Sequence, residues 1–236
     1  SFLISASDIA VDPNVGFLFY ADLGKRGERH PPEIGKAYMD GSFRQFLVRD
    51  KIVAPSALSL DYINQKIYWT DYHMDHIQAI DYTGQGRVTI LSGRRNTPHP
   101  YGISVFEDNV YVSDLTQMNI RRVNKYRGVS SAKELYKNTA KKPLHVAVVH
   151  SLRQPKLRDA CVNASCQHMC VLTHVSDNDQ LGYRCMCDVG YQLNDDLTTC
   201  KRLESFVLFS TDHTIRGVPL TPTATFNTEA ITPSIN

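Results

Sequence analysis

The segment Lys66-Ile67-Tyr68-Trp69-Thr70-Asp71 is the middle copy of an internal repeat. Similar segments end at Asp22, 49 residues before Asp71, and at Asp114, 43 residues after it. Each copy follows a short apolar run and closes with the same aspartate, which fixes how the copies align. Recurrence at about 40–50 residues indicates a repeat architecture in which each copy is one supersecondary unit.

Within each copy, apolar and polar residues alternate over short runs that Gly, Pro, Asn or Asp bounds, a pattern typical of strands. The strands predicted in this way cover residues 9–12, 17–22, 34–39 and 44–48, then 58–61, 66–71, 76–81 and 87–91, then 103–106 and 109–114. Four short strands per roughly 40–45 residues is the size of a propeller blade. A β-sandwich also has short strands, but it gives no reason for four-strand units to recur with the same aspartate.

The cysteines mark a second region, because all six lie between Cys161 and Cys200. So short a segment needs covalent links to fold, which indicates disulfides and an oxidising, extracellular compartment.

The charges of the chain nearly cancel, with 26 Lys and Arg residues against 24 Asp and Glu residues. The whole chain therefore has no strong electrostatic attraction to nucleic acid or a membrane, and any electrostatic function is local. No run reaches the ~20 apolar residues of a membrane span, and Ser1–Ala6 lacks signal-peptide features. We therefore expect a fragment of a longer extracellular chain, whose membrane span lies outside it.

The repeat resembles a known blade motif. Tyr68-Trp69-Thr70-Asp71, with Leu58-Ser59-Leu60-Asp61 before it and Ile80-Asp81-Tyr82-Thr83-Gly84 after it, is similar to the YWTD repeat of propellers in the low-density lipoprotein receptor family. The resemblance covers nearly residues 7–157. Because the family's propellers have six blades, it implies an all-β fold with about three blades of a partial six-bladed YWTD β-propeller.

The outer copies diverge from this motif, reading Phe19-Tyr20-Ala21-Asp22 and Tyr111-Val112-Ser113-Asp114. The run Pro143–Val149 reads as the first strand of a further blade. The resemblance implies three parts, which are the C-terminal half of a propeller (1–157), a small disulfide-rich EGF-like domain (158–201), and the first strands of a following propeller with a disordered tail (202–236).

The cysteine spacing carries the second resemblance. Six cysteines allow fifteen connectivities, and the sequence alone does not choose among them. The gaps of four, three, fourteen, one and twelve residues, together with Gly182-Tyr183 and Gly190-Tyr191, resemble an EGF-like module. That resemblance implies the disulfides Cys161–Cys170, Cys166–Cys185 and Cys187–Cys200.

Metal sites and modification can be judged in the same region. A zinc site using these cysteines and His168 is the competing reading, but paired Cys-x-x-Cys spacings are missing. Arg158-Asp159-Ala160 offers one carboxylate before Cys161, too few for calcium. We expect no metal or cofactor in this segment, with calcium confined to repeats outside it. Asn163-Ala164-Ser165 is a glycosylation sequon.

No arrangement typical of an enzyme is present. The sequence has no Gly-rich phosphate loop and no nucleophile elbow, and propeller lactonases need several acidic calcium ligands at the channel. The repeated Asp22, Asp71 and Asp114 could be catalytic carboxylates, but their recurrence in every copy favours a structural role as hydrogen-bonding pins. We expect a protein that is not an enzyme.

A candidate ligand face lies at one end of the blades, where loops follow each second strand and lead into each first strand. Five of the nine histidines lie in or beside these loops, and imidazole gains charge between pH ~5 and 8. The candidate residues are Asp75, His73, His76, His99, Arg26 and Arg29. Asp75 matches the position that contacts an asparagine of inhibitor peptides in Wnt co-receptor propellers, and a carboxylate there would favour a cationic group. Exposed loops that simply tolerate histidine and charge are the alternative.

The resemblance implies a multiligand endocytic receptor, in which this segment acts in ligand binding and release during receptor-mediated endocytosis. Its expected partners are extracellular protein or lipoprotein ligands and neighbouring receptor modules, without nucleic acid. Its expected place is the extracellular side of the plasma membrane and endosomes, in a single-pass membrane receptor. A Wnt co-receptor ectodomain and a nidogen-like matrix propeller remain alternatives.

Overall fold

The computed structural model describes residues 5–25, 30–153, 159–175, 180–188, 190–204, 206–210 and 215–219. The chain divides into two compact units, Phe2–Arg158 and, with Ser1, Asp159–Asn236. No helix among the described residues is long and apolar enough to cross a membrane.

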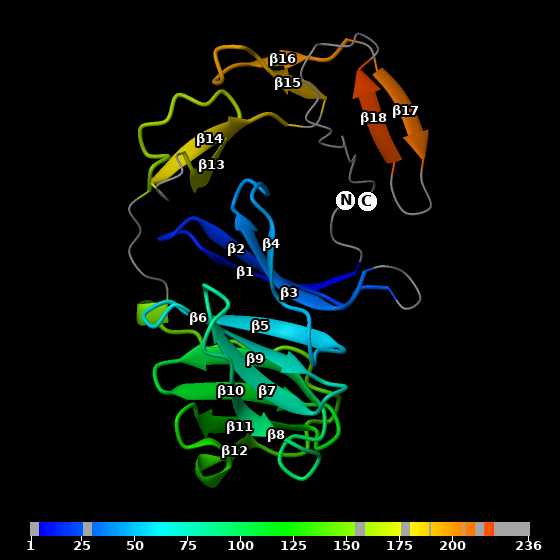
Figure 1. Ribbon diagram of the computed structural model, residues 1–236, viewed down its shortest axis with the longest axis vertical. Helices are drawn as coiled ribbons and strands as arrows, with labels where there is room; N and C mark the ends of the chain where they lie inside the picture. The colour runs from blue at the N-terminus through cyan, green and yellow to red at the C-terminus, as the bar shows by residue number, and fades with distance from the viewer. Residues whose placement is uncertain are drawn as a thin grey trace. The chain divides into compact units, whose positions relative to one another are not determined.

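The first unit contains three four-stranded antiparallel sheets, which are the predicted blades (Figure 1). The first blade consists of β1 (Ala6–Asp12), β2 (Phe17–Asp22), β3 (Glu33–Tyr38) and β4 (Gln45–Val48). The second consists of β5 (Pro55–Asp61), β6 (Lys66–Asp71), β7 (His76–Asp81) and β8 (Val88–Ser92). The third consists of β9 (Pro100–Phe106), β10 (Asn109–Asp114), β11 (Asn119–Asn124) and β12 (Lys133–Tyr136), with a short 3₁₀ turn, η1 (Gly128–Ser131), before β12.

The first strands of the blades are longer than the apolar alternation predicts. β5 and β9 begin at Pro55 and Pro100, three residues before the runs 58–61 and 103–106. The pairing shifts by one residue between Pro55 and Ala57, as it does at the start of β1. A bulge of this kind breaks the period of two, so alternation alone misses the residues before it.

Neighbouring blades are joined by buried apolar side chains from adjacent sheets. On β6, Ile67 and Trp69 pack toward the first blade, against Phe19 and Ile34 among others. Tyr68 points the other way and packs with Val110 and further residues of the third blade. Successive side chains of a strand point to opposite faces, so the single sequence Ile-Tyr-Trp supplies both junctions. Trp69 is fully buried.

The repeated aspartate fixes both loops at one end of its blade. Asp71 Oδ2 accepts hydrogen bonds from Val53 N at 2.7 Å and Ala54 N at 3.1 Å, in the loop leading into β5. Its Oδ1 accepts hydrogen bonds from His73 N at 3.1 Å and Met74 N at 3.0 Å, in the turn after β6. One buried carboxylate therefore satisfies four backbone donors that have no strand partner.

The same arrangement recurs in the outer copies. Asp114 accepts from His99 N at 3.3 Å on one side and from Thr116 N at 2.9 Å on the other. Asp22 accepts from Ser5 N at 3.2 Å and Gly24 N at 2.7 Å. The aspartates are thus bound to backbone in all three blades, whatever residues precede them in the motif.

The run Pro143–Val149, expected as a strand, is not one in the structure. It nevertheless lies beside β9, where Val148 N donates to Ser104 Oγ at 3.0 Å. Val105 N donates to Ser59 Oγ at 2.9 Å between the second and third blades in the same way. The run therefore occupies the position of a fourth blade's first strand, and it forms no ladder because none of the described strands lies beside it as a second strand.

Polar pairs join the ends of first strands to the next blade. Asp61 Oδ2, at the end of β5, accepts a hydrogen bond from Lys125 Nζ at 2.7 Å, and both side chains are buried. Asp12 Oδ2, at the end of β1, accepts a hydrogen bond from the Tyr82 hydroxyl at 3.1 Å. Phe106 stands at this position in β9, where its ring packs against His150 with centroids 4.8 Å apart. The ends of β5, β1 and β9 are therefore joined to the following part of the chain by an ion pair, a hydrogen bond from a neutral hydroxyl and a ring contact, respectively.

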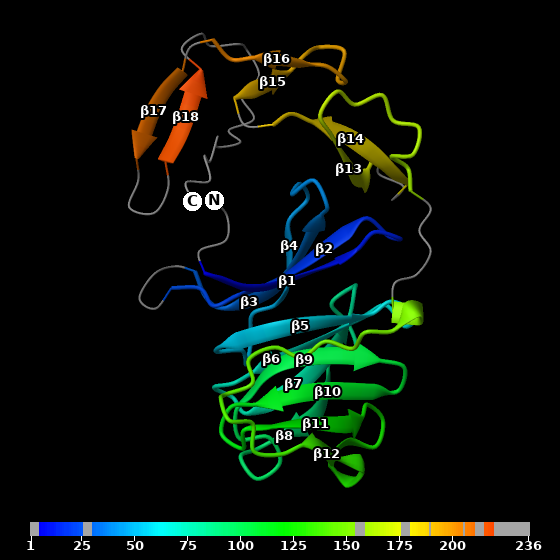
Figure 2. The ribbon, with the colours of Figure 1, turned by 180° about the vertical axis from the view of Figure 1, so that it is seen from behind.

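The second unit contains hairpins (Figures 1 and 2) and three disulfides. Its strands are β13 (Met169–His174), β14 (Leu181–Met186), β15 (Tyr191–Leu193), β16 (Cys200–Arg202), β17 (Phe206–Ser210) and β18 (Ile215–Pro219). They form the pairs β13-β14, β15-β16 and β17-β18. The disulfides join Cys161 to Cys170, Cys166 to Cys185 and Cys187 to Cys200.

Candidate functional site

The candidate site lies at the end of the second and third blades where Asp71 and Asp114 bind the loops, which we call the loop end. The turn Tyr72–Asp75 joins β6 to β7, and the loop Gly93–His99 joins β8 to β9. Gly93 N donates to Asp75 O at 2.9 Å, and Thr97 N donates to Gly93 O at 3.1 Å. These backbone bonds hold the turn of one blade against the loop that leads into the next.

Asp75 is the carboxylate at the centre of this site. Its backbone has a φ of 51°, in the left-handed region that aspartate tolerates in tight turns. Only 7% of the residue is exposed. Arg94 Nε lies 3.2 Å from Oδ2, while His99 Nδ1 lies 3.6 Å from Oδ1. Oδ1 is buried without a hydrogen bond, so one acceptor remains for a donor that enters the site.

Aromatic rings run beside Asp75 from the second blade to the run 143–149. The ring centroids of Tyr72 and His99 lie 6.4 Å apart, and those of Tyr72 and Tyr101 lie 6.0 Å apart. Tyr101 in turn lies 6.2 Å from His145, ring to ring. Flat, partly exposed rings next to a charged group supply contact area at little entropic cost, as ligand-binding surfaces do.

His76 differs from the other candidates because it is 6% exposed and its Nε2 has no hydrogen-bond partner. Burial lowers the pKa of His76, and the Arg87 charge lowers it further, while Asp71 and Asp75 oppose both. The ring is therefore neutral at physiological pH. His73, three residues earlier, is exposed on the turn.

The structure brings only some of the candidate residues together. Asp75 and His99 meet across two blades, whereas His73 is in solvent and His76 is inside the sheet. Arg26 and Arg29 lie outside the described residues. Arg94 and Tyr101 were not predicted, because Arg94 lies at the far end of the loop leading into β9 and Tyr101 lies inside β9. Tyr101 lies directly after the bulged start of a first strand. An alignment of the blades marks this position, so Tyr101 could have been predicted from it.

In the second unit, the only described group of potential metal ligands that lies close together is His168, Cys187 and Cys200. The two cysteines are joined in a disulfide, so they offer no thiolate. His168 Nδ1 accepts a hydrogen bond from Asp188 N at 3.0 Å. The residues present therefore do not fit the zinc alternative.

Three propeller blades followed by a three-disulfide module are typical of modular extracellular proteins. The chain is 34% identical over 196 residues to the vitellogenin receptor Yl of Drosophila melanogaster, a match that covers 83% of this chain and 9% of that protein. With its YWTD-type blades, the chain is a segment of a low-density lipoprotein receptor family member. No family model matches it.

Solved structures support the fold. A nidogen/laminin complex matches with a TM-score of 0.54 and 18% identity, over 62% of this chain and 53% of that one. A luciferin-regenerating enzyme matches with a TM-score of 0.50 and 12% identity, over 83% and 59%. Because these neighbours include both a matrix protein and an enzyme, the fold alone does not assign activity.

Proposed function

We propose that this chain is an extracellular segment of an endocytic lipoprotein receptor that takes part in binding and releasing ligand. The identity to a vitellogenin receptor over most of the chain carries this proposal. It supports the endocytic branch over a Wnt co-receptor ectodomain, and the 18% identity to the nidogen complex gives a matrix role no support beyond the fold. The proposed partners are a vitellogenin-type lipoprotein and neighbouring receptor modules, at the cell surface and in endosomes.

The loop end is the proposed contact surface. A cationic group of the ligand would bind Asp75 Oδ1, the acceptor without a hydrogen bond, beside the Tyr72 and Tyr101 rings. His99 lies 3.6 Å from the same oxygen. Imidazole is the side chain that gains charge between pH ~5 and 8, and a cation at this position would compete with the ligand for Asp75. Acidification would therefore weaken binding.

Binding of the chain to purified vitellogenin should be measured at pH 7.4 and pH 5.5. We expect about tenfold weaker binding at the acidic pH, since one ion pair replaced by a like-charge contact is worth roughly 1–2 kcal/mol. The double variant His76→Gln, His99→Gln should lose most of this dependence. His73→Gln, on the exposed turn, is the matched control. A chain that does not bind at neutral pH, or a double variant with unchanged pH dependence, contradicts the proposal.

The remaining parts of the chain have proposed roles as modules. Residues 1–157 would be the C-terminal half of a six-bladed ring, with 143–149 completing a blade whose other strands lie elsewhere in the parent protein. The hairpin β17-β18, in the span 202–236, would open a second propeller, and the intervening disulfide module would be a spacer. The tail from Thr221, expected to be disordered, lies outside the described residues.

We also propose that Asn163 carries an N-linked glycan. The residue is exposed in the turn where Ala164 N donates to Cys161 O at 3.0 Å. Chain secreted from animal cells should migrate faster in electrophoresis after treatment with peptide N-glycosidase. Ser165→Ala should remove this shift, since it destroys the sequon. An untreated chain with the mobility of Ser165→Ala would show that the site is unused.

A further inference from the structure

Positive charge is concentrated in one part of this nearly neutral chain. Residues 94–142 contain ten Lys and Arg against four Asp and Glu, while the whole chain has 26 against 24. The rest of the chain therefore carries an excess of acidic residues. Such separation creates a local field that the net charge conceals.

The fold gathers part of this charge at the loop end of the third blade. The Arg121 guanidinium on β11 donates to Asn96 O and so holds the loop 93–99. Thr139 N and Oγ1 both donate to Met118 O, at 2.9 and 3.0 Å, which joins the loop 137–142 to the loop after β10. Loops from three places in the sequence thus lie on one end of the blade.

Five exposed cations project from these loops, and we call them the basic rim. They are Arg94, Arg95, Lys137, Lys141 and Lys142. The Arg94 side chain is 85% exposed even though it pairs with Asp75. In contrast to the buried Lys125, whose charge Asp61 neutralises, these side chains extend into solvent.

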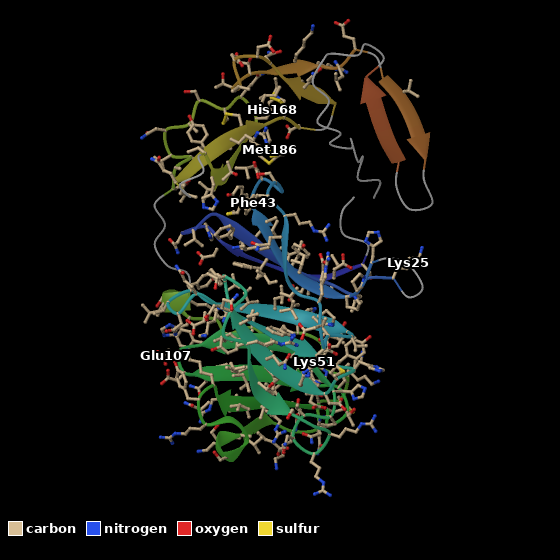
Figure 3. All side chains as sticks on the ribbon, in the orientation of Figure 1. Lys25, Phe43, Lys51, Glu107, His168 and Met186 are labelled. Atoms are coloured by element: carbon tan, nitrogen blue, oxygen red, sulfur yellow. A yellow bond between two sulfur atoms is a disulfide. The ribbon has the colours of Figure 1, made fainter. Side chains whose placement is uncertain are left out.

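The acidic residues nearby cancel only part of the rim's charge. Glu134 pairs with Lys137 at 2.8 Å, and Asp114 is buried with its oxygens on backbone donors. Glu107, labelled in Figure 3, and Asp108 lie in the β9–β10 turn, at the opposite end of the blade. Among the described residues, no carboxylate lies within ion-pair distance of Arg95, Lys141 or Lys142.

We propose that the basic rim binds a sulfated glycosaminoglycan chain. Its cations are long, exposed and spread over separate loops, an arrangement that suits repeated charges on an extended polymer. The disulfides place the module outside the cell, where sulfated polysaccharides are the abundant polyanions. Each neutralised sulfate releases counterions, so binding depends steeply on salt. The rim shares Arg94 with the proposed ligand contact at Asp75, so its test uses Arg95, Lys141 and Lys142, which do not pair with Asp75.

The test measures binding of the full 236-residue chain to a heparin oligosaccharide over a range of salt concentrations. The triple variant Arg95→Ser, Lys141→Ser, Lys142→Ser should weaken binding by about tenfold or more and reduce the slope of log K against log salt by about 2–3. All three side chains are exposed and none forms an ion pair with a described residue, so the fold should be retained.

The control variant Arg127→Ser, Lys201→Ser, Arg202→Ser removes the same charge from exposed positions outside the rim. It should leave the affinity within about twofold of the original chain. Equal losses in both triple variants would show a general charge effect and overturn the proposal. A second result would also overturn the proposal. The chain would bind phosphatidylserine vesicles but not heparin, and the rim variant would abolish the vesicle binding, because the rim would then be a membrane contact.

Discussion

Replacing Asp71 by alanine is expected to lower the free energy of unfolding of the propeller unit by about 3–5 kcal/mol. The substitution leaves four backbone N–H groups without an acceptor, two in each of the loops that Asp71 joins. Each buried donor that loses its partner costs roughly 1–3 kcal/mol, less where water can reach it. The stability of Asp71→Asn should lie between those of Asp71→Ala and the original chain, because the asparagine amide keeps only one acceptor oxygen.

Urea-induced unfolding can be followed by fluorescence, since Trp69 is the single tryptophan and lies fully buried two residues from Asp71. Asp108→Ala, on an exposed turn of the third blade, is the matched control and should change stability by less than about 0.5 kcal/mol. A loss below about 1 kcal/mol for Asp71→Ala would show that the repeated aspartate does not hold the loops in place.

The second large effect is expected at the ion pair between the second and third blades. Lys125→Met should destabilise the unit by about 3–5 kcal/mol, because it leaves the buried Asp61 carboxylate without its counter-charge. The double variant Asp61→Leu, Lys125→Met removes both charges and should recover most of the loss. Recovery would identify the cost as that of an unpaired charge. A double variant as unstable as Lys125→Met would instead point to packing.

The pH dependence gives this pair a second signature. Burial alone would raise the pKa of Asp61, but hydrogen bonds from Lys125 and Asn64 outweigh it and lower the pKa. A lowered pKa in the folded state gives stability that is present above the carboxylate's unfolded value and is lost as the pH falls through the folded value. Lys125→Met removes the largest influence that lowers the pKa of Asp61, so this variant should lose less stability on acidification than the original chain.

Features formed by residues close together in the sequence could be predicted, whereas contacts between distant residues could not. The strands and the aspartates at 22, 71 and 114 could be predicted, because both follow from patterns within one repeat. The Asp61–Lys125 pair joins residues 64 apart in the sequence, and nothing near either residue indicates the other. At the loop end, Asp75 and His99 were named separately, but their meeting depends on how the loop Gly93–His99 folds back onto the preceding turn.

Burial was the other quantity that the sequence did not supply. His73 and His76 lie on the same short stretch, yet one is in solvent and the other is 6% exposed. The strand β7 begins at His76, whose side chain is buried, whereas His73 lies on the turn before it, so exposure depends on where the strand starts. The run Pro143–Val149 shows a related limit, since its apolar alternation is clear while its partner strand is not among the described residues.

The different chemistry at the ends of the first strands has a consequence for how such repeats assemble in order. The Asp12 carboxylate meets a tyrosine hydroxyl, Asp61 meets an ammonium group, and Phe106 meets an imidazole ring. If the third blade took the place of the second, Lys125 would face Asp12 but Phe106 would face a polar partner from its new neighbour. Blades with the same backbone arrangement therefore differ in the side chains at their junctions. A duplicated or shuffled blade would meet a complementary side chain on at most one side.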